Sequence, residues 1–150
     1  MIRLLPVTPE NWRALNALSV REDQKTFVAA NLAILARAYA FREYRARALA
    51  ICEGEKPVGL LMLRDGDDPP CYVLDQFMVD ARFQGRGFGR EALRQVLELM
   101  AREGRYGSVE LCYKKENADT RDFYLAAGFL PTGDEDGDEV MLSLDLPHPA

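Results

Sequence analysis

The chain has 150 residues, of which 48% are hydrophobic, and this is enough to bury the core of a single domain. Its formal charge of -5 makes a general nucleic-acid-binding surface improbable by charge alone. No apolar run reaches the roughly 18 residues of a membrane span, and the N-terminus has no apolar segment typical of a signal peptide. We therefore expect one cytoplasmic domain over residues 1–150 that binds neither nucleic acids nor membranes.

The residues that most often hold metals or act as nucleophiles are few. The three cysteines, Cys52, Cys71 and Cys112, lie in apolar, strand-like runs without a C-x-x-C pair, so we expect buried thiols. The single histidine, His148, stands almost at the end of the chain. A histidine metal cluster and a Ser-His-Asp triad are therefore implausible, and no metal is predicted.

The first part of the chain predicts one strand and two helices. Residues 2–7 have the composition of a strand, and Thr8 followed by Pro9 favours the start of a helix that continues to residue 18. Residues 22–39 carry apolar side chains at helical spacing and predict a second helix. Asn31 lies within its apolar surface, where it can either tie down a neighbouring loop or provide a polar contact in a pocket wall.

The rest of the chain alternates strand and helix patterns. Residues 72–79 are rich in aromatic and branched side chains, whereas a helical period begins at Phe88 and ends before Gly104. The other predicted segments are strands at 46–53, 57–63, 108–113, 129–132 and 139–144, a polar loop at 64–70 and a helix at 117–127. The resulting order, β-α-α-β-β-β-α-β-α-β-β, predicts a mixed sheet covered by helices, with a parallel βαβ unit around the glycine-rich turn.

That turn, Gln84-Gly-Arg-Gly-Phe-Gly89, joins the strand at 72–79 to the following helix. Glycines allow positive φ and close approach of a ligand, and the free N–H groups of a helix N-terminus attract an anion such as phosphate. The turn lacks the G-x-x-x-x-G-K-[ST] pattern of phosphate-loop NTPases. A dinucleotide fingerprint is weakened because Arg90 replaces its third glycine, although Glu110 lies where a ribose-binding acid would.

The turn fits the pattern [RQ]-x-x-G-x-[GA] without exception, and with the strand before it resembles the acyl-CoA loop of the GCN5-related N-acetyltransferases (GNAT superfamily). The resemblance extends over essentially the whole chain and implies a mixed α/β fold of that type, a single N-acetyltransferase domain, and acetyl-CoA as cofactor. It implies backbone contacts from the end of the strand and a pyrophosphate site in the turn. The residues it assigns to the cofactor are Phe77, Met78, Val79, Gln84, Gly85, Arg86, Gly87, Phe88, Gly89, Arg90 and Asn117.

A second motif, Asn117 followed by Tyr124 and Gly128-Phe129, also resembles this family. Asn117 and Tyr124 lie two helical turns apart and can face the same ligand. By resemblance, Asn117 contacts the cofactor and Tyr124 is the general acid that protonates the leaving thiolate. A backbone bulge expected at 76–79 would turn the N–H of Met78 or Val79 toward the thioester carbonyl.

The attacking amine must be neutral, because an alkylamine with a pKa near 10.4 is mostly protonated at pH 7. Asp75 lies on the same strand, four residues before Val79, and is the candidate base for this proton. Two other roles remain open for its carboxylate: binding the cation without taking a proton, or forming a structural salt bridge.

The acceptor is the least determined part of the prediction. Residues 24–31 and 74–80 resemble bacterial spermine/spermidine acetyltransferases, which implies a polyamine substrate. Glu22, Asp75, Asn31 and Glu43 would then supply acceptor contacts. The alternatives are a protein N-terminus, an amino acid or an aminoglycoside as acceptor, or a non-catalytic acyl-CoA-binding domain. The resembled family often forms dimers, so a homodimer is an open expectation.

Overall fold

The computed structural model describes residues 1–147, and His148 lies outside them. They form one mixed sheet of seven strands in the order β1-β2-β3-β4-β5-β7-β6, in which β4 and β5 are parallel and the other neighbours antiparallel. The strands are β1 (Ile2–Pro6), β2 (Arg47–Glu53), β3 (Lys56–Asp67), β4 (Pro70–Val79), β5 (Ser108–Lys114), β6 (Leu130–Asp136) and β7 (Glu139–Asp145). The helices are α1 (Trp12–Ala17), α2 (Asn31–Ala40), α3 (Phe88–Glu103) and α4 (Ala118–Ala126).

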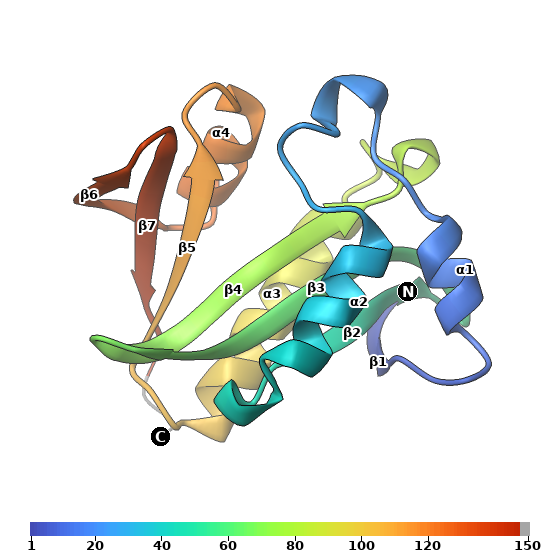
Figure 1. The fold of residues 1–150 in the computed structure, drawn as a ribbon, viewed down its shortest axis with the longest axis horizontal. Helices are drawn as coiled ribbons and strands as arrows, with labels where there is room; N and C mark the ends of the chain where they lie inside the picture. Colours follow the sequence, from blue (N-terminus) through green and yellow to red (C-terminus); the bar gives the residue numbers. More distant parts are fainter. Residues whose placement is uncertain (148–150) are drawn as a thin grey trace.

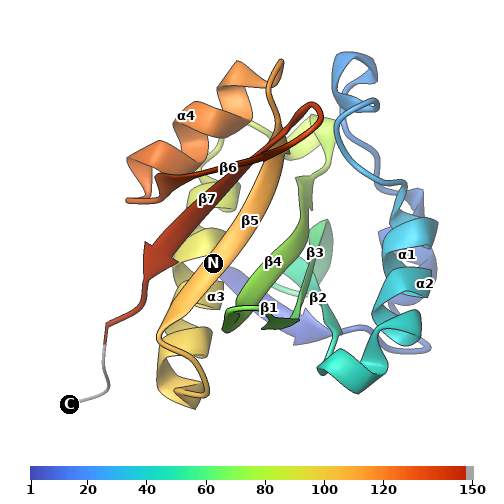
Figure 2. The same cartoon turned by 60° about the vertical axis from the view of Figure 1, so that its left-hand side comes forward.

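The helices cover both faces of the sheet. Figures 1 and 2 show α1 and α2 together on one face and α3 on the other, with α4 beside β5 and β7. The core is accordingly split into two clusters of buried side chains, one on each face. The predicted element order and mixed α/β fold are confirmed.

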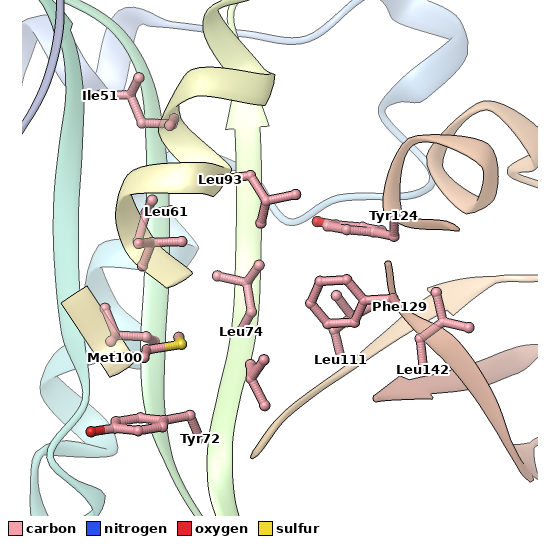
Figure 3. Close-up of a cluster of buried hydrophobic side chains, with 14 of the residues drawn as sticks. Ile51, Leu61, Tyr72, Leu74, Leu93, Met100, Leu111, Tyr124, Phe129 and Leu142 are labelled. Atoms are coloured by element: carbon pink, nitrogen blue, oxygen red, sulfur yellow. The ribbon is translucent and has the colours of Figure 1, made fainter. Parts of the chain in front are cut away.

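The larger core cluster joins α3 to the two halves of the sheet. Leu93 and Met100 of α3 pack over Tyr72 and Leu74 of β4, and the cluster continues to Phe129 beyond β5 (Figure 3). Apolar residues at helical spacing on α3 meet alternate residues of a buried strand, which is the pattern that the sequence carries. This packing holds α3 against β4 and so positions the turn that joins them.

The parallel strands β4 and β5 pair for only a short distance. Their register contains two residue pairs, Tyr72 with Val109 and Val73 with Glu110. Beyond Val73 the strands separate, as Figure 1 shows, and β5, β7 and β6 form a second arm of the sheet. The backbone of β4 from Leu74 onward therefore has no strand partner on its β5 side.

The predicted second helix at 22–39 is wrong over its first half. The structure has a 3₁₀ turn at Glu22–Gln24 and a non-helical connection before α2 begins at Asn31. The side chain of Asn31 donates to the carbonyl oxygen of Leu15 at 2.7 Å, so a tertiary contact fixes this helix start. Apolar periodicity could not reveal that break, because Phe27 and Val28 face a cavity instead of continuing a helix.

Three smaller predictions also need correction. The polar loop expected at 64–70 is the end of a hairpin, since β3 extends to Asp67, which pairs with Pro70. The charged residues of this segment suggested an exposed loop. Asp65 is instead buried, and its carboxylate pairs with Arg45 and Arg105. The first helix begins at Trp12 instead of Pro9. Of the three cysteines expected to be buried, Cys52 and Cys71 are buried, whereas Cys112 is exposed.

Gly59 of β3 offers a test of this packing. An added Cβ would overlap the carbonyl oxygen of Met78, whereas at Gly107 it would meet nothing within 4 Å. We expect Gly59→Ala to lower the free energy of unfolding by about 1–3 kcal/mol, because the β3–β4 backbones must move apart. Urea denaturation measures this loss, and Gly107→Ala is the control. Equal stability of the two variants would contradict the close packing of β3 on β4.

Candidate active site

The separation of β4 from β5 opens a cavity of about 900 Å³, large enough for a small-molecule ligand. Its wall combines the end of β4, the turn before α3, the ends of β5 and α4, and residues of the connection between α1 and α2. Most of the predicted site residues are brought together in this wall. They are Asp75, Phe77, Met78, Val79, Gln84, Gly85, Gly87, Phe88, Gly89, Arg90, Asn117 and Tyr124.

The backbone of β4 presents two residues toward the opening. The N–H of Asp80 donates to the carbonyl oxygen of Val58 at 2.8 Å, and the register continues as Gly59 with Val79 and Leu60 with Met78. Hydrogen-bonded and non-bonded pairs alternate along antiparallel strands. Met78 therefore directs its N–H and C=O to β3, whereas those of Val79 and Phe77 point away from β3, into the opening.

A β-bulge interrupts β4 one step earlier than the sequence predicted. Leu63 pairs with Leu74 and Met62 pairs with Gln76, so Asp75 is the extra residue. The bulge expected at 76–79 thus lies at residue 75. Such an inserted residue bends its strand and increases the local twist, which helps to carry the end of β4 away from β5.

The glycine-rich turn has the geometry of an anion site. Gly85 and Gly87 adopt positive φ of 78° and 82°, and Gly87 is the N-cap residue of α3 without a side-chain cap. The first N–H groups of α3 are therefore directed at the end of the cavity, where a phosphate would be stabilised. Arg90 lines this end, whereas Arg86 lies outside the lining and stacks its guanidinium near the Phe83 ring.

Gln84 lies in the cavity wall, but its side chain is engaged within the protein. Its Nε2 donates to the carbonyl oxygen of Val79 and to Oε1 of Gln24, both at 2.9 Å. Its Oε1 accepts from Arg21 at 3.0 Å. The sequence predicted a donor to a diphosphate, whereas the contacts make Gln84 a brace between the turn, the end of β4 and the 3₁₀ turn.

Tyr124 is held by aromatic packing under the opening. Its ring lies edge-on to Phe123 and Phe129, with centroids 5.1 and 5.5 Å away, and only 7% of the residue is exposed. Figure 3 shows its hydroxyl oxygen directed toward β4. Burial raises the pKa of Tyr124 above its usual value, so the phenol stays protonated at neutral pH.

Asn117 caps α4 and lines the same cavity. Its Oδ1 accepts from the backbone N–H of Thr120 at 3.2 Å, and its Nδ2 has no partner within residues 1–147. The sequence motif did not reveal Phe123, whose ring lies 5.9 Å from that of Phe77 and bridges the two arms of the opening. Tyr124 was recognised by its position in the family motif, whereas Phe123 belongs to no motif that the sequence analysis could use.

Asp75 is the most constrained carboxylate in the site. Arg37 donates to both of its oxygens, at 3.2 and 2.9 Å, Arg64 donates at 2.7 Å and Gln76 at 3.1 Å. Burial opposes ionisation of Asp75, but the hydrogen bonds from Arg37 and Arg64 outweigh it and hold its pKa below the usual range. Of the three roles left open, these contacts support the salt bridge, because such a carboxylate is a weak base with its charge already compensated.

Two other predicted acceptor residues lie outside the cavity wall. Glu22 is exposed and pairs with Lys25 at 2.7 Å. Asn31 is buried, and its Nδ2 contacts the Leu15 carbonyl and Met78 Sδ, so it ties down a neighbouring loop. The sequence did not point to Arg37 or Arg64, although both are charged residues that adjoin apolar runs. Asp119 and Glu139 are the further carboxylates in the wall.

Residues 1–147 contain no group of three or more His, Cys, Asp or Glu side chains placed to hold a metal ion. Within the same range, no helix combines the length and apolar character needed to cross a membrane.

The family model described as the acetyltransferase (GNAT) family matches residues 8–129. The chain belongs to the GNAT family. It is therefore an N-acetyltransferase that uses acetyl-CoA, as the sequence predicted. This GNAT enzyme is 27% identical over 148 residues to a spermine/spermidine N(1)-acetyltransferase of Bacillus subtilis, a match that covers 94% of the chain and 97% of the relative.

Solved structures share the fold at low sequence identity. Spermidine N-acetyltransferase from Vibrio cholerae, in complex with CoA and spermine, has a TM-score of 0.73 and 16% identity, covering 97% of this chain and 95% of that one. The ribosomal-protein-S18-alanine N-acetyltransferase from Escherichia coli also has a TM-score of 0.73, at 17% identity, covering 100% and 97%. Enzymes with different acceptors thus match this GNAT chain equally well, and the fold alone does not choose between them.

The contacts of Asp75 predict a pH-dependent contribution to stability. We expect Asp75→Asn to lose about 1–3 kcal/mol of unfolding free energy at pH 7, because two arginines lose a charged partner. A lowered folded-state pKa means that the carboxylate stabilises the fold above the unfolded pKa of about 3.9, and that this contribution is lost as pH falls through the folded value. The difference between wild type and variant should therefore shrink below about pH 4.

Urea unfolding at several pH values measures this difference. Asp122→Asn is the matched control, because Asp122 pairs with Arg121 on the surface. It should change stability by at most about 0.5 kcal/mol. A loss at Asp75 that stays constant from pH 7 to pH 3 would show that its ionised form is not the stabilising one.

Proposed function

We propose that this enzyme transfers the acetyl group by direct attack of a primary amine on the thioester of acetyl-CoA, and that the amine is a polyamine. The observation that carries the mechanism is the shared cavity. The unpaired backbone of β4, the helix N-terminus of α3 and the hydroxyl of Tyr124 all border it. A direct transfer needs no enzyme nucleophile, which agrees with a wall that has no Ser-His pair.

The same wall supports a placement for the cofactor. The pyrophosphate would bind at the turn of Gly85 to Gly89, against the first N–H groups of α3. The pantetheine arm would lie along Phe77 and Val79 and pair with the outward N–H of Val79 and C=O of Phe77, as an additional strand does, because the Val79 C=O already accepts from Gln84. Asn117 would contact the arm from the opposite side with its free Nδ2. This order places the thioester between the end of β4 and α4.

Two groups would act on the reacting atoms. The arm runs away from the turn, so the N–H of Phe77, which also points into the opening and lies farther from the turn than Val79, would donate to the thioester oxygen and stabilise the oxyanion of the tetrahedral intermediate. The sequence suggested Met78 or Val79 for this role, but the N–H of Met78 is directed to β3 and that of Val79 would pair with the arm. Tyr124 would donate its proton to the leaving thiolate, and the proton that the attacking nitrogen loses on forming the amide would pass through water to restore the phenol. The thiolate of a thiol with a pKa near 8.5 is a weaker base than tyrosinate, and the raised pKa of Tyr124 makes it a weak acid, so it transfers its proton only as negative charge develops on sulfur.

The amine itself must arrive neutral or lose its proton to water. Asp75 is a poor base here because Arg37 and Arg64 stabilise its ionised form. The rate should therefore rise with pH as more of the amine becomes neutral.

A polyamine acceptor is supported by the Bacillus subtilis relative and by the acidic balance of the chain. A polyamine carries several cations and requires spaced carboxylates. Asp119 and Glu139 line the cavity and can provide them, although Lys114 lies 3.5 Å from Glu139 and offsets part of its charge. Glu22, which the sequence suggested for this purpose, would need the connection between α1 and α2 to move.

The experiment that tests this function measures thiol release from acetyl-CoA with purified enzyme and a panel of amines. The panel contains spermidine, spermine, putrescine, lysine, a peptide that begins with alanine, and kanamycin. Release with spermidine or spermine well above the other amines would support the polyamine acceptor. Faster release with another amine would refute the polyamine assignment and keep the mechanism, whereas no release with any amine, despite CoA binding, would argue against the transfer to amines.

Replacing Tyr124 separates chemistry from binding. We expect Tyr124→Phe to lower kcat by roughly 10²-fold or more, the range of general acid catalysis, because the thiolate must then leave unprotonated. The ring packing is retained, so the Kd for CoA should change by less than about threefold. Tyr106→Phe is the control, since Tyr106 packs on Tyr72 away from the cavity. An unchanged kcat in Tyr124→Phe would exclude Tyr124 as the acid.

A further inference from the structure

Two segments that are distant in sequence meet beside the cavity. One is the connection between α1 and α2, and the other is the loop between β4 and α3; Figures 1 and 2 both show them side by side. A backbone clamp joins them: the N–H of Ser19 donates to Asp80 Oδ2 at 2.9 Å, and the N–H of Ala81 donates to the Ser19 carbonyl at 2.9 Å. Asp80 is buried and also accepts from Arg82. This clamp holds the two segments together through contacts within the protein.

A second connection is made by side chains, closer to the ligand site. Gln84 Nε2 donates to Gln24 Oε1 at 2.9 Å, and Arg21 donates to Gln84 Oε1 at 3.0 Å. Gln24 Oε1 also accepts from the backbone N–H of Arg21 at 3.1 Å. Gln84 Nε2 also donates to the Val79 carbonyl. The amide of Gln84 therefore bonds both to β4, which would hold the cofactor, and to Gln24 in the 3₁₀ turn, which borders the space for the acceptor.

The position of this bridge indicates more than a structural role. Gln24 and Gln84 both line the cavity, and neither is fully buried. Hydrogen bonds between partly exposed amides contribute little to stability, and the Asp80 clamp already fixes the two segments. Phe27 and Val28, three and four residues after Gln24, contribute apolar side chains to the same wall. A shift of the glycine-rich turn would therefore reach this wall through Gln84.

We propose that Gln84 is a positioning residue that couples the cofactor turn to the acceptor wall through Gln24. Cofactor bound at Gly85 to Gly89 stabilises the bonded position of Gln84, and through it that of Gln24 and the wall formed by Phe27 and Val28. The acceptor therefore binds more tightly to the enzyme with cofactor than to the free enzyme, and by linkage the acceptor strengthens cofactor binding by the same factor. This inference rests on the proposed function for the acceptor, but its first consequence concerns CoA alone.

That consequence is tested by a double-mutant cycle on CoA binding. The Kd for CoA is measured by calorimetry for wild type, Gln24→Ala, Gln84→Ala and the double variant, with no acceptor present. Within residues 1–147, the side chain of Gln24 makes its hydrogen bond to the cofactor turn with Gln84. We expect Gln24→Ala to weaken CoA binding by roughly 5-fold, at the lower end of coupling between sites, and to add nothing further once Gln84 is alanine.

The control is Gln95→Ala on α3, because Gln95 bonds to Ile2 and Glu91 outside the cavity. Its Kd for CoA should equal that of wild type. Unchanged CoA binding in Gln24→Ala, or fully additive effects of the two substitutions, would overturn the coupling. Thermal melts of all variants show whether each remains folded.

A second measurement uses the amine that gives the fastest release in the panel. With saturating acetyl-CoA, Gln24→Ala should raise the KM for this amine several-fold and change kcat by less than about threefold. A purely structural role would lower both activity and stability without this split. If no amine is acetylated, the proposed function fails, while the CoA cycle still decides whether Gln24 and Gln84 are coupled.

Discussion

The separation of β4 from β5 is the constraint on which the site depends. Two parallel strands that share only two residue pairs leave a row of backbone groups without partners. Unpaired polar backbone in a protein interior is unfavourable, so the opening is stable only if solvent or a ligand satisfies those groups. The bulge at Asp75 bends β4, and the rings of Phe77 and Phe123 pack on each other across the opening. The fold thus keeps one strand edge available for an extended ligand with amide groups of its own.

The charges near this opening are arranged by the same bulge. Asp75 is the residue that the bulge inserts, and its carboxylate faces Arg37 of α2 and Arg64 of β3. Removing three ionic groups from bulk water is costly unless each is satisfied, and here the two arginines and Gln76 supply four hydrogen bonds to one carboxylate. The group ties α2 to the sheet where the strand is distorted. Its role is to hold the opening in shape, which is why a carboxylate on a catalytic strand need not be a base.

The local geometry of the proposed cofactor half of the site could be predicted from the sequence, because it depends on requirements of the backbone. Positive φ at Gly85 and Gly87, a helix N-terminus at Phe88 and a cap at Asn117 are local requirements that restrict the residue type. The acceptor half could not be predicted in this way. Asn31 and Glu22 were plausible by residue type, yet one is held by the Leu15 carbonyl and the other pairs with Lys25. Their tertiary partners decide what they do, and no pattern along the chain records those partners.

The same difference explains why the shared fold does not identify the acceptor molecule. Backbone N–H and C=O groups of β4 and α3 make up most of the proposed cofactor side, and backbone geometry survives extensive change of side chains. The proposed acceptor side consists of side chains on α2, β5, α4 and the connection before α2, so its charge and shape can change while the sheet does not. Enzymes that act on spermidine and on an alanine of a ribosomal protein can therefore match this structure equally well. The Gln24–Gln84 bridge lies where the two halves meet, and there a change of acceptor wall can alter cofactor binding without changing the fold.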